Sequence, residues 1–139
     1  MSNVDTHRAI MNAFSRRDWD EAVRAVREDC LYTDHPRNLS VKGPREMADW
    51  LQGWTQAFPD AKPVDTHIID GGEYTVALFH AQGTNDGPLG SLPATGKRMD
   101  VPFCEVLRYD SEGHIVAGEA FYDVTTLMVQ LGHMPPLPT

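Results

Sequence analysis

The chain of 139 residues contains only two cysteines, Cys30 and Cys104, and no long apolar run. Two cysteines in a chain that is long enough to bury a core are typical of free thiols rather than of a disulfide scaffold. No stretch approaches the ~18 apolar residues of a membrane helix, and the first residues lack the apolar segment of a signal peptide. We therefore expect a soluble protein of the reducing cytoplasm.

Positive charge is also scarce. Twelve Lys and Arg residues stand against twenty Asp and Glu residues, which gives a formal net charge of −8. Such a field repels the phosphates of nucleic acids and the headgroups of anionic lipids. The sequence therefore predicts neither a nucleic-acid partner nor a membrane partner.

Motifs for cofactors and covalent nucleophiles are missing as well. There is no HExxH, CxxC or GxSxG pattern, and the Gly-rich segment GPLGSLPATGK (87–97) lacks the GxxxxGK[ST] pattern of a phosphate-binding loop. The six histidines never stand at a close ligand spacing, so a metal site would need distant histidines to meet in space. We expect no metal and no organic cofactor, and a loop or a lid at 87–97.

Helical periodicity dominates the first part of the chain. Apolar residues recur at intervals of three and four in residues 10–14, in residues 19–26 after a cap at Asp18, and in residues 47–58. The third stretch begins at Gly43 and Pro44, and Pro59 limits its extension. Three helices are expected here, with a strand at residues 30–35 before the third.

Strands and turns dominate the second part. Residues 64–70, 73–83, 99–110 and 114–123 predict a four-stranded antiparallel meander, followed by a helix over 124–132 with Gly132 at its end. Helices followed by strands indicate a single α+β domain over residues 1–139, with helices on one face of the sheet. Because residues 74–81 carry apolar side chains on both faces, we also expect a homodimer or a higher homo-oligomer.

Acidic residues interrupt two of these strands. Glu119 and Asp123 flank Phe121 on one face of the last strand, and burial of that face would raise their pKa values toward those of a general acid or base. Alternatively both look outward, or Asp123 caps the following helix. Glu105 lies similarly between Phe103 and Leu107, where an ion pair on the strand face is the simpler interpretation.

Other polar and aromatic residues are candidates by position. His80 ends an apolar strand face, and His35 closes the first strand just before Pro36. Aromatic residues on the third helix are typical of a core but can also hold a ligand. The pocket candidates are Tyr32, His35, Trp54, Phe58, Phe103 and Phe121.

The order of these segments resembles a known family. AFPDA at the end of the long helix, GPLGSLPATGK, YDSEGHIVAGEAFYD and the closing LMVQLG are similar to segments of SnoaL-like polyketide cyclases, in the nuclear transport factor 2 (NTF2)-like superfamily. The resemblance covers nearly the whole chain. It implies a cone of curved antiparallel sheet around a long helix, with an apolar pocket for a small hydrophobic substrate and no cofactor.

The resemblance also implies a reaction. In cyclases of this family, the aspartate that ends the last long strand is the general acid and base of an intramolecular aldol closure, and Asp123 stands at that position. Glu105 and His80 are the next catalytic candidates. Limonene-type epoxide hydrolases share the fold, so hydrolysis or isomerisation is the alternative reaction. Hydrolysis ranks second because Glu119 stands where their arginine would be, which removes the partner expected to hold the two acids.

A third possibility is a binding module without catalysis, because one fold hosts many functions. A pocket lined only by apolar groups, with Asp123 turned to solvent, would favour that module over an enzyme.

Overall fold

The computed structural model describes residues 1–139 as four helices and one six-stranded sheet. In chain order the elements are α1 (Asn3–Arg16), α2 (Trp19–Ala22), β1 (Val26–Asp34), β2 (Leu39–Lys42), α3 (Gly43–Ala57), β3 (Lys62–Gly71), β4 (Tyr74–Thr84), β5 (Arg98–Tyr109), β6 (Ile115–Tyr122) and α4 (Val124–Leu131). The α+β prediction is confirmed. No helix is long and apolar enough to cross a membrane.

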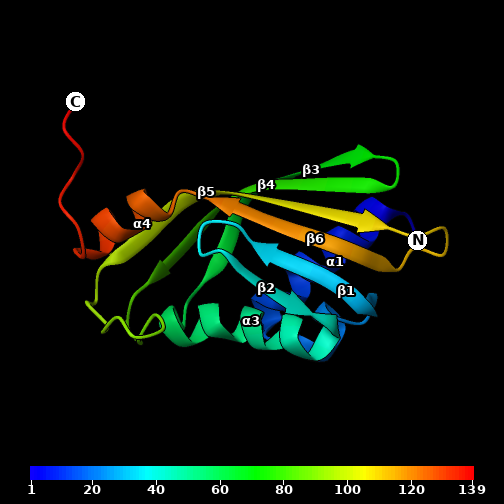
Figure 1. The fold of residues 1–139 in the computed structure, drawn as a ribbon, viewed down its shortest axis with the longest axis horizontal. Helices are drawn as coiled ribbons and strands as arrows, with labels where there is room; N and C mark the ends of the chain where they lie inside the picture. The colour runs from blue at the N-terminus through cyan, green and yellow to red at the C-terminus, as the bar shows by residue number, and fades with distance from the viewer.

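The sheet has the strand order β2-β1-β6-β5-β4-β3 (Figure 1). Strands β3 to β6 form the predicted antiparallel meander, and β1 then joins β6 in parallel. The short strand β2 pairs with β1 as a hairpin, which the sequence did not predict. Strand β1 also begins earlier than expected, because Val26 belongs to the strand and α2 ends at Ala22.

Local sequence explains where the helices begin and end. The hydroxyl of Ser2 accepts the Asp5 N–H at 3.0 Å while the Asp5 carboxylate accepts the Ser2 N–H at 3.2 Å, which is a capping box at the start of α1. Gly43 opens α3 with a φ of 78°, and a Cβ there would lie 2.9 Å from the Glu28 carbonyl oxygen. Gly132 ends α4 in the left-handed region, as predicted.

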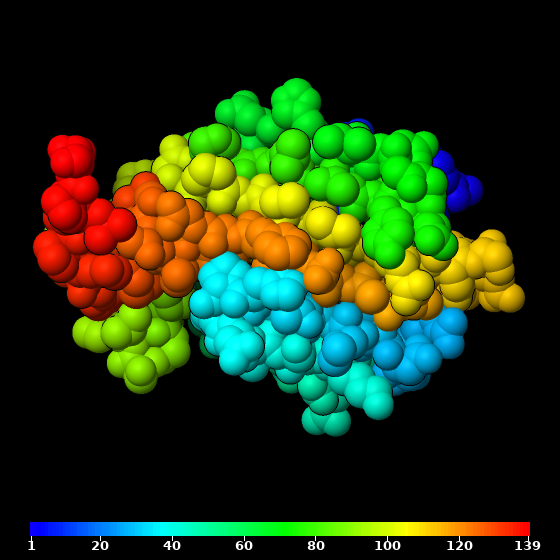
Figure 2. All heavy atoms as spheres, turned by 45° about the horizontal axis from the view of Figure 1, so that its top comes forward, coloured from blue at the N-terminus to red at the C-terminus, as the bar shows by residue number.

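The core lies between the helices and the concave face of the sheet (Figure 1). Helix α3 packs under β1 and β2, and α1 packs under β3 and β4. Figure 2 shows the opposite face of the sheet, where the strands run side by side with no helix over them. Exposed apolar side chains, among them Leu31, Leu78 and Phe121, lie on these strands.

Candidate active site

An apolar cavity of about 70 Å³ lies between the helices and the concave face. Helices α1 and α3 and strands β3, β4 and β5 contribute its lining. Large apolar side chains in the lining are Met11, Phe14, Leu51, Trp54, Phe79 and Phe103. Glu105 on β5 is the one carboxylate among the lining residues, so any acid/base chemistry of a carboxylate in this cavity falls to it.

Glu105 is 5% exposed, and two side chains from different elements hold its carboxylate. His7 on α1 places Nε2 2.9 Å from Oε1, and the Tyr32 hydroxyl on β1 donates to Oε2 at 2.5 Å. The other ring nitrogen of His7 lies 2.7 Å from Thr75 Oγ1, which in turn lies 2.8 Å from the Tyr109 hydroxyl. Five side chains from α1, β1, β4 and β5 therefore form one buried hydrogen-bonded chain.

More than one proton arrangement satisfies every link of this chain, and one of them leaves Glu105 ionised and His7 neutral. In that arrangement Tyr109 donates to Thr75, Thr75 donates to Nδ1 of a neutral His7, and His7 Nε2–H and the Tyr32 hydroxyl both donate to an ionised Glu105. A buried carboxylate without such donors would carry a large desolvation cost. The network therefore allows a charged base beside an apolar cavity.

The position of Tyr32 depends on a glycine in the neighbouring strand. A Cβ at Gly118 would lie 2.4 Å from Cδ2 of the Tyr32 ring, closer than atoms can approach. Gly118 pairs with Tyr32 in the parallel ladder between β1 and β6. The missing side chain at residue 118 thus leaves the space in which the phenol reaches Glu105.

Burial and nearby carboxylates shift the acidity of the tyrosines in the core. Burial, and then the charge of Glu105, holds the pKa of Tyr32 well above its ordinary value. Burial raises the pKa of Tyr109 to about 12, against an ordinary value of 10.0. Burial is also the main reason why the pKa of Tyr122 is raised. These phenols therefore act as hydrogen-bond donors at neutral pH.

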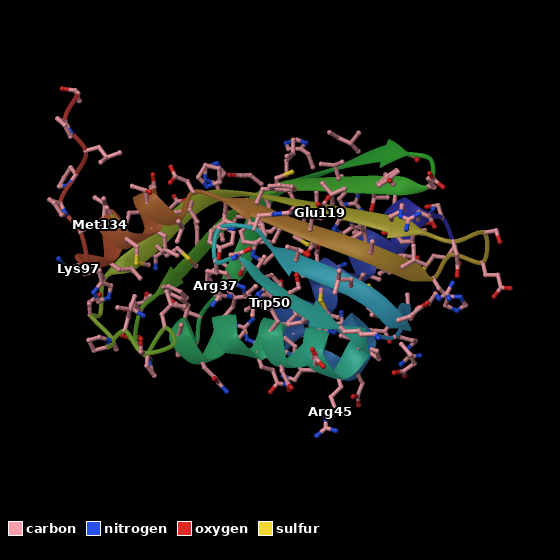
Figure 3. The ribbon with its side chains drawn as sticks, viewed as in Figure 1. Arg37, Arg45, Trp50, Lys97, Glu119 and Met134 are labelled. Carbon is pink, nitrogen blue, oxygen red and sulfur yellow. The ribbon has the colours of Figure 1, made fainter.

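A second buried carboxylate, Asp34 at the end of β1, is fully paired. It accepts hydrogen bonds from Trp50 Nε1 at 3.0 Å, from the Tyr122 hydroxyl at 2.9 Å and from Arg37 Nε at 2.8 Å. Figure 3 shows Arg37 and Trp50 together in the space between the sheet and α3. Because Asp34 has these donors and is 1% exposed, its part is to hold Arg37, Trp50 and Tyr122 in place.

No three His, Cys, Asp or Glu side chains gather closely enough to hold a metal ion. Both cysteines are free, and burial raises the pKa of Cys30 to about 11.

The geometry can be compared with known proteins. The chain matches the family model described as SnoaL-like polyketide cyclase over residues 4–131. It belongs to this family.

Solved structures show the same fold. A protein of Jannaschia sp. CCS1, provisionally named a SnoaL-like polyketide cyclase, has a TM-score of 0.85 at 21% identity, with 96% of this chain and 93% of that chain covered. AclR of Streptomyces galilaeus, provisionally named a hydroxylase, has a TM-score of 0.82 at 20% identity over 98% and 84% of the two chains.

A Catenulispora acidiphila protein described as having a ketosteroid isomerase-like fold has a TM-score of 0.78 at 16% identity, with 96% of this chain and 97% of that chain covered. No curated protein matches the chain. The NTF2-like fold expected from the sequence is confirmed.

In this SnoaL-like protein Asp123 does not lie in the apolar cavity. It is exposed and caps α4, accepting the Thr126 N–H at 2.9 Å and the Thr126 hydroxyl at 2.6 Å, and these two bonds lower its pKa. The expectation of a buried face with Glu119, Phe121 and Asp123 is therefore wrong. A β-bulge between Ile115 and Ala117 shifts the register by one residue, which turns these side chains outward.

Three other predicted site residues lie on the outer face of the sheet. His80 pairs with Asp100 at 2.9 Å, and its side chain is about half exposed. The ring of His35 stacks on Phe121 with centroids 4.6 Å apart, and His35 Nε2 lies 2.9 Å from Glu119 Oε1. These residues do not reach the cavity; Phe121 and His80 border an open groove with Asp123.

The structure brings the remaining predicted residues together in the core. Trp54 and Phe103 line the cavity, and Tyr32 reaches it through Glu105. Phe58 is fully buried and stacks on Trp54 with centroids 6.3 Å apart, so it supports the wall rather than lining it.

Sequence reasoning missed three members of the buried chain around Glu105, His7, Thr75 and Tyr109. His7 lies three residues before Ile10 on the buried stripe of α1, and that polar residue in an apolar stripe is the clue that could have identified it. Thr75 and Tyr109 gave no comparable clue, because each reads as an ordinary strand residue.

Proposed function

We propose that this protein is a cofactor-independent acid/base enzyme that closes or isomerises a small hydrophobic polyketone, with Glu105 as the acting group. One observation carries the proposal: the one carboxylate on the cavity wall is buried and hydrogen-bonded to two side chains that fix its direction. Membership of the SnoaL-like polyketide cyclase family supports the reaction class. The acting residue differs from Asp123, the aspartate that the family resemblance favoured.

The reaction is balanced without any co-reactant. The Glu105 carboxylate takes a proton from a carbon between two carbonyl groups, and the electron pair of that C–H bond forms an enolate. The enolate carbon attacks a second carbonyl of the same molecule, forming a C–C bond and an alkoxide. The alkoxide takes the proton back from Glu105, so the product is an isomer of the substrate.

His7 and Tyr32 assist as positioning residues. Their hydrogen bonds to the two oxygens of Glu105 keep the carboxylate in one orientation. Such positioning is worth several kcal/mol when it holds a base in the geometry of attack. The apolar wall excludes water, which keeps the enolate from competing protonation.

The volume of the cavity limits what enters it. A single water molecule needs ~10–15 Å³ of cavity volume, so about 70 Å³ accommodates only a few atoms of a substrate. We infer that the reacting end of the substrate enters the cavity, and that the rest of the substrate is bound elsewhere.

The structure favours this proposal over both alternatives. A purely apolar pocket would have indicated a binding module, and Asp123 does face solvent, but Glu105 lines the cavity. An epoxide hydrolase of the limonene type would need an arginine where Glu119 stands, and Glu119 points outward to His35.

The test is turnover of a panel of aromatic polyketones by three proteins: wild type, Glu105→Gln and Asp123→Asn. Glutamine keeps the shape of Glu105 but cannot take a proton, so we expect a loss of ~10²- to 10⁴-fold in kcat. Asparagine caps a helix about as well as aspartate, so Asp123→Asn should turn over at the rate of the wild type and melt at its temperature. A fully active Glu105→Gln enzyme would refute the proposal, and an inactive but folded Asp123→Asn enzyme would restore Asp123 as the base.

A further inference from the structure

A second cavity, of about 240 Å³, lies on the other side of the core. It is enclosed by Arg37 from the turn between β1 and β2, by the loop around Leu89–Leu92, and by Leu127 and Met128 of α4. Trp54 borders this cavity as well as the cavity of Glu105. A molecule in the second cavity therefore shares one wall with a group bound beside Glu105.

Two side chains that line this second cavity, Arg37 and Trp54, carry donors that a ligand could use. Arg37 donates from its backbone N–H and its Nε to Asp34, at 3.3 and 2.8 Å, and its side chain is 35% exposed, so its terminal nitrogens are accessible to water or to a ligand. The guanidinium lies over the Trp54 ring, 5.1 Å from its centroid. Trp54 is 8% exposed, and its indole N–H is buried and has no hydrogen-bond partner. A buried donor without an acceptor is rare in folded proteins, so the Trp54 N–H needs an explanation.

The charge balance around Arg37 favours a neutral acceptor. Asp34 is buried 2.8 Å from Arg37 Nε, so the pair has no net charge before anything binds. A ligand carboxylate would have to lose its water and to approach the like charge of Asp34, and both effects cost free energy. A ketone or ester oxygen accepts the same hydrogen bonds without adding a charge.

The loop that closes the cavity is held firmly at its base. Asn85 is fully buried; its Nδ2 donates to the Ala57 and Gly87 carbonyl oxygens at 3.3 and 2.8 Å, and its Oδ1 accepts the Thr95 N–H at 2.9 Å. Gly87 lies so close to α3 that a Cβ would collide with the Gln56 carbonyl oxygen. This loop, which the sequence suggested as a lid, is therefore anchored and forms part of the cavity wall.

From these contacts we propose that the second cavity binds a neutral carbonyl group of an aromatic ketone or ester, with the terminal nitrogens of Arg37 donating to the carbonyl oxygen and Trp54 available as a second donor. This inference rests on the proposed function for the kind of substrate, and it adds the site that holds the end remote from Glu105. Arg37 is a binding and specificity residue here, because it does not touch the reacting carbon.

The experiment measures binding, so it does not depend on turnover. ¹⁵N-labelled protein is titrated with acetophenone, with ethylbenzene, which replaces the carbonyl by a methylene, and with benzoate. The side-chain N–H peaks of the three tryptophans report binding, and a Trp54→Phe spectrum identifies the Trp54 peak. The variants are Arg37→Met, Leu92→Trp, which fills the cavity and leaves Arg37 paired with Asp34, and the control Arg45→Met. Arg45 is exposed and points away from the molecule (Figure 3).

In the wild type we expect acetophenone to shift the Trp54 peak and to bind more tightly than benzoate. The ratio of the acetophenone and ethylbenzene affinities should fall on the order of tenfold or more in Arg37→Met, because a hydrogen bond from a charged donor is lost. Arg45→Met should keep the wild-type ratio. Leu92→Trp should abolish acetophenone binding.

An unchanged ratio in a folded Arg37→Met protein would overturn the proposal, and so would benzoate binding as tight as that of acetophenone. If Arg37→Met does not fold, Leu92→Trp decides, since acetophenone binding at wild-type strength there would place the ketone elsewhere. Glu105→Gln separates this proposal from the proposed function. Intact ketone selectivity together with unimpaired turnover in Glu105→Gln would refute the function and leave the carbonyl site standing.

Discussion

Replacement of Asp34 by asparagine should destabilise the protein strongly although it changes only one non-hydrogen atom. The carboxylate is 1% exposed and accepts hydrogen bonds from Trp50, Tyr122 and Arg37. Asparagine offers one acceptor oxygen and one NH₂ group, so at least one of the surrounding donors would face another donor. Arg37 would also lose the counter-ion that it meets at 2.8 Å.

The magnitude follows from these losses. Removing one partner of a buried ion pair costs roughly 3–5 kcal/mol, and the shape of asparagine and the partial exposure of Arg37 place the expected loss at about 3 kcal/mol. A chain of 139 residues unfolds with an entropy of about 0.3 kcal/mol per kelvin, so this loss lowers Tm by about 10 °C.

The assay is thermal and urea unfolding of Asp34→Asn beside Asp100→Asn. Asp100 undergoes the same chemical change, but its carboxylate is about half exposed and pairs with His80 at 2.9 Å. An exposed pair contributes ~1 kcal/mol or less, so Asp100→Asn should unfold close to the wild type. Equal, small losses in both variants would refute the reasoning that the Asp34 network stabilises the core.

Three further predictions follow from the same structure. The pKa of Tyr109 is raised to about 12 and that of Tyr32 is also raised, so above pH 10 the unfolded chain loses phenol protons that the folded chain keeps. The free energy of unfolding, measured with urea, should therefore fall as pH rises from 10 to 12, and a flat profile would contradict this. The outer face of the sheet should mediate a homodimer, so light scattering should give twice 15.5 kDa, and Leu78→Glu, at a residue 41% exposed, should give the monomer mass; a monomeric wild type would rule the dimer out. Turnover should survive dialysis against a chelator, and activity that returns only with added metal would contradict a cofactor-independent enzyme.

Local patterns predicted much of the fold. The stripe on α3, the four strands of the meander and the Gly132 cap of α4 follow from residues close together in sequence, and all are confirmed. The parallel pairing of β1 with β6 joins residues far apart in the chain, so no local pattern reveals it. Strand β2 is only four residues long, LSVK, which is too short for its alternation to be recognised.

The candidate site was harder to predict than the fold because it depends on which way strand residues face. Alternation showed that Glu105 shares a face with Phe103, and that face is the inner one. The same counting failed for Asp123, since the bulge near Val116 reverses the faces of β6 after Ile115. His7 meets Glu105 across 98 residues of sequence, so only the folded structure brings the pair together.

The central claim is that Glu105 removes a proton from a carbon acid in the inner cavity. The most direct test is deuterium exchange, followed by NMR, at the methylene of a small aryl 1,3-diketone in D₂O with wild type, Glu105→Gln and Asp123→Asn. Exchange reports proton removal alone and needs no ring closure. We predict that wild type and Asp123→Asn speed the exchange equally, and that Glu105→Gln loses ~10²-fold or more of that acceleration. Exchange by folded Glu105→Gln at the wild-type rate would contradict the account.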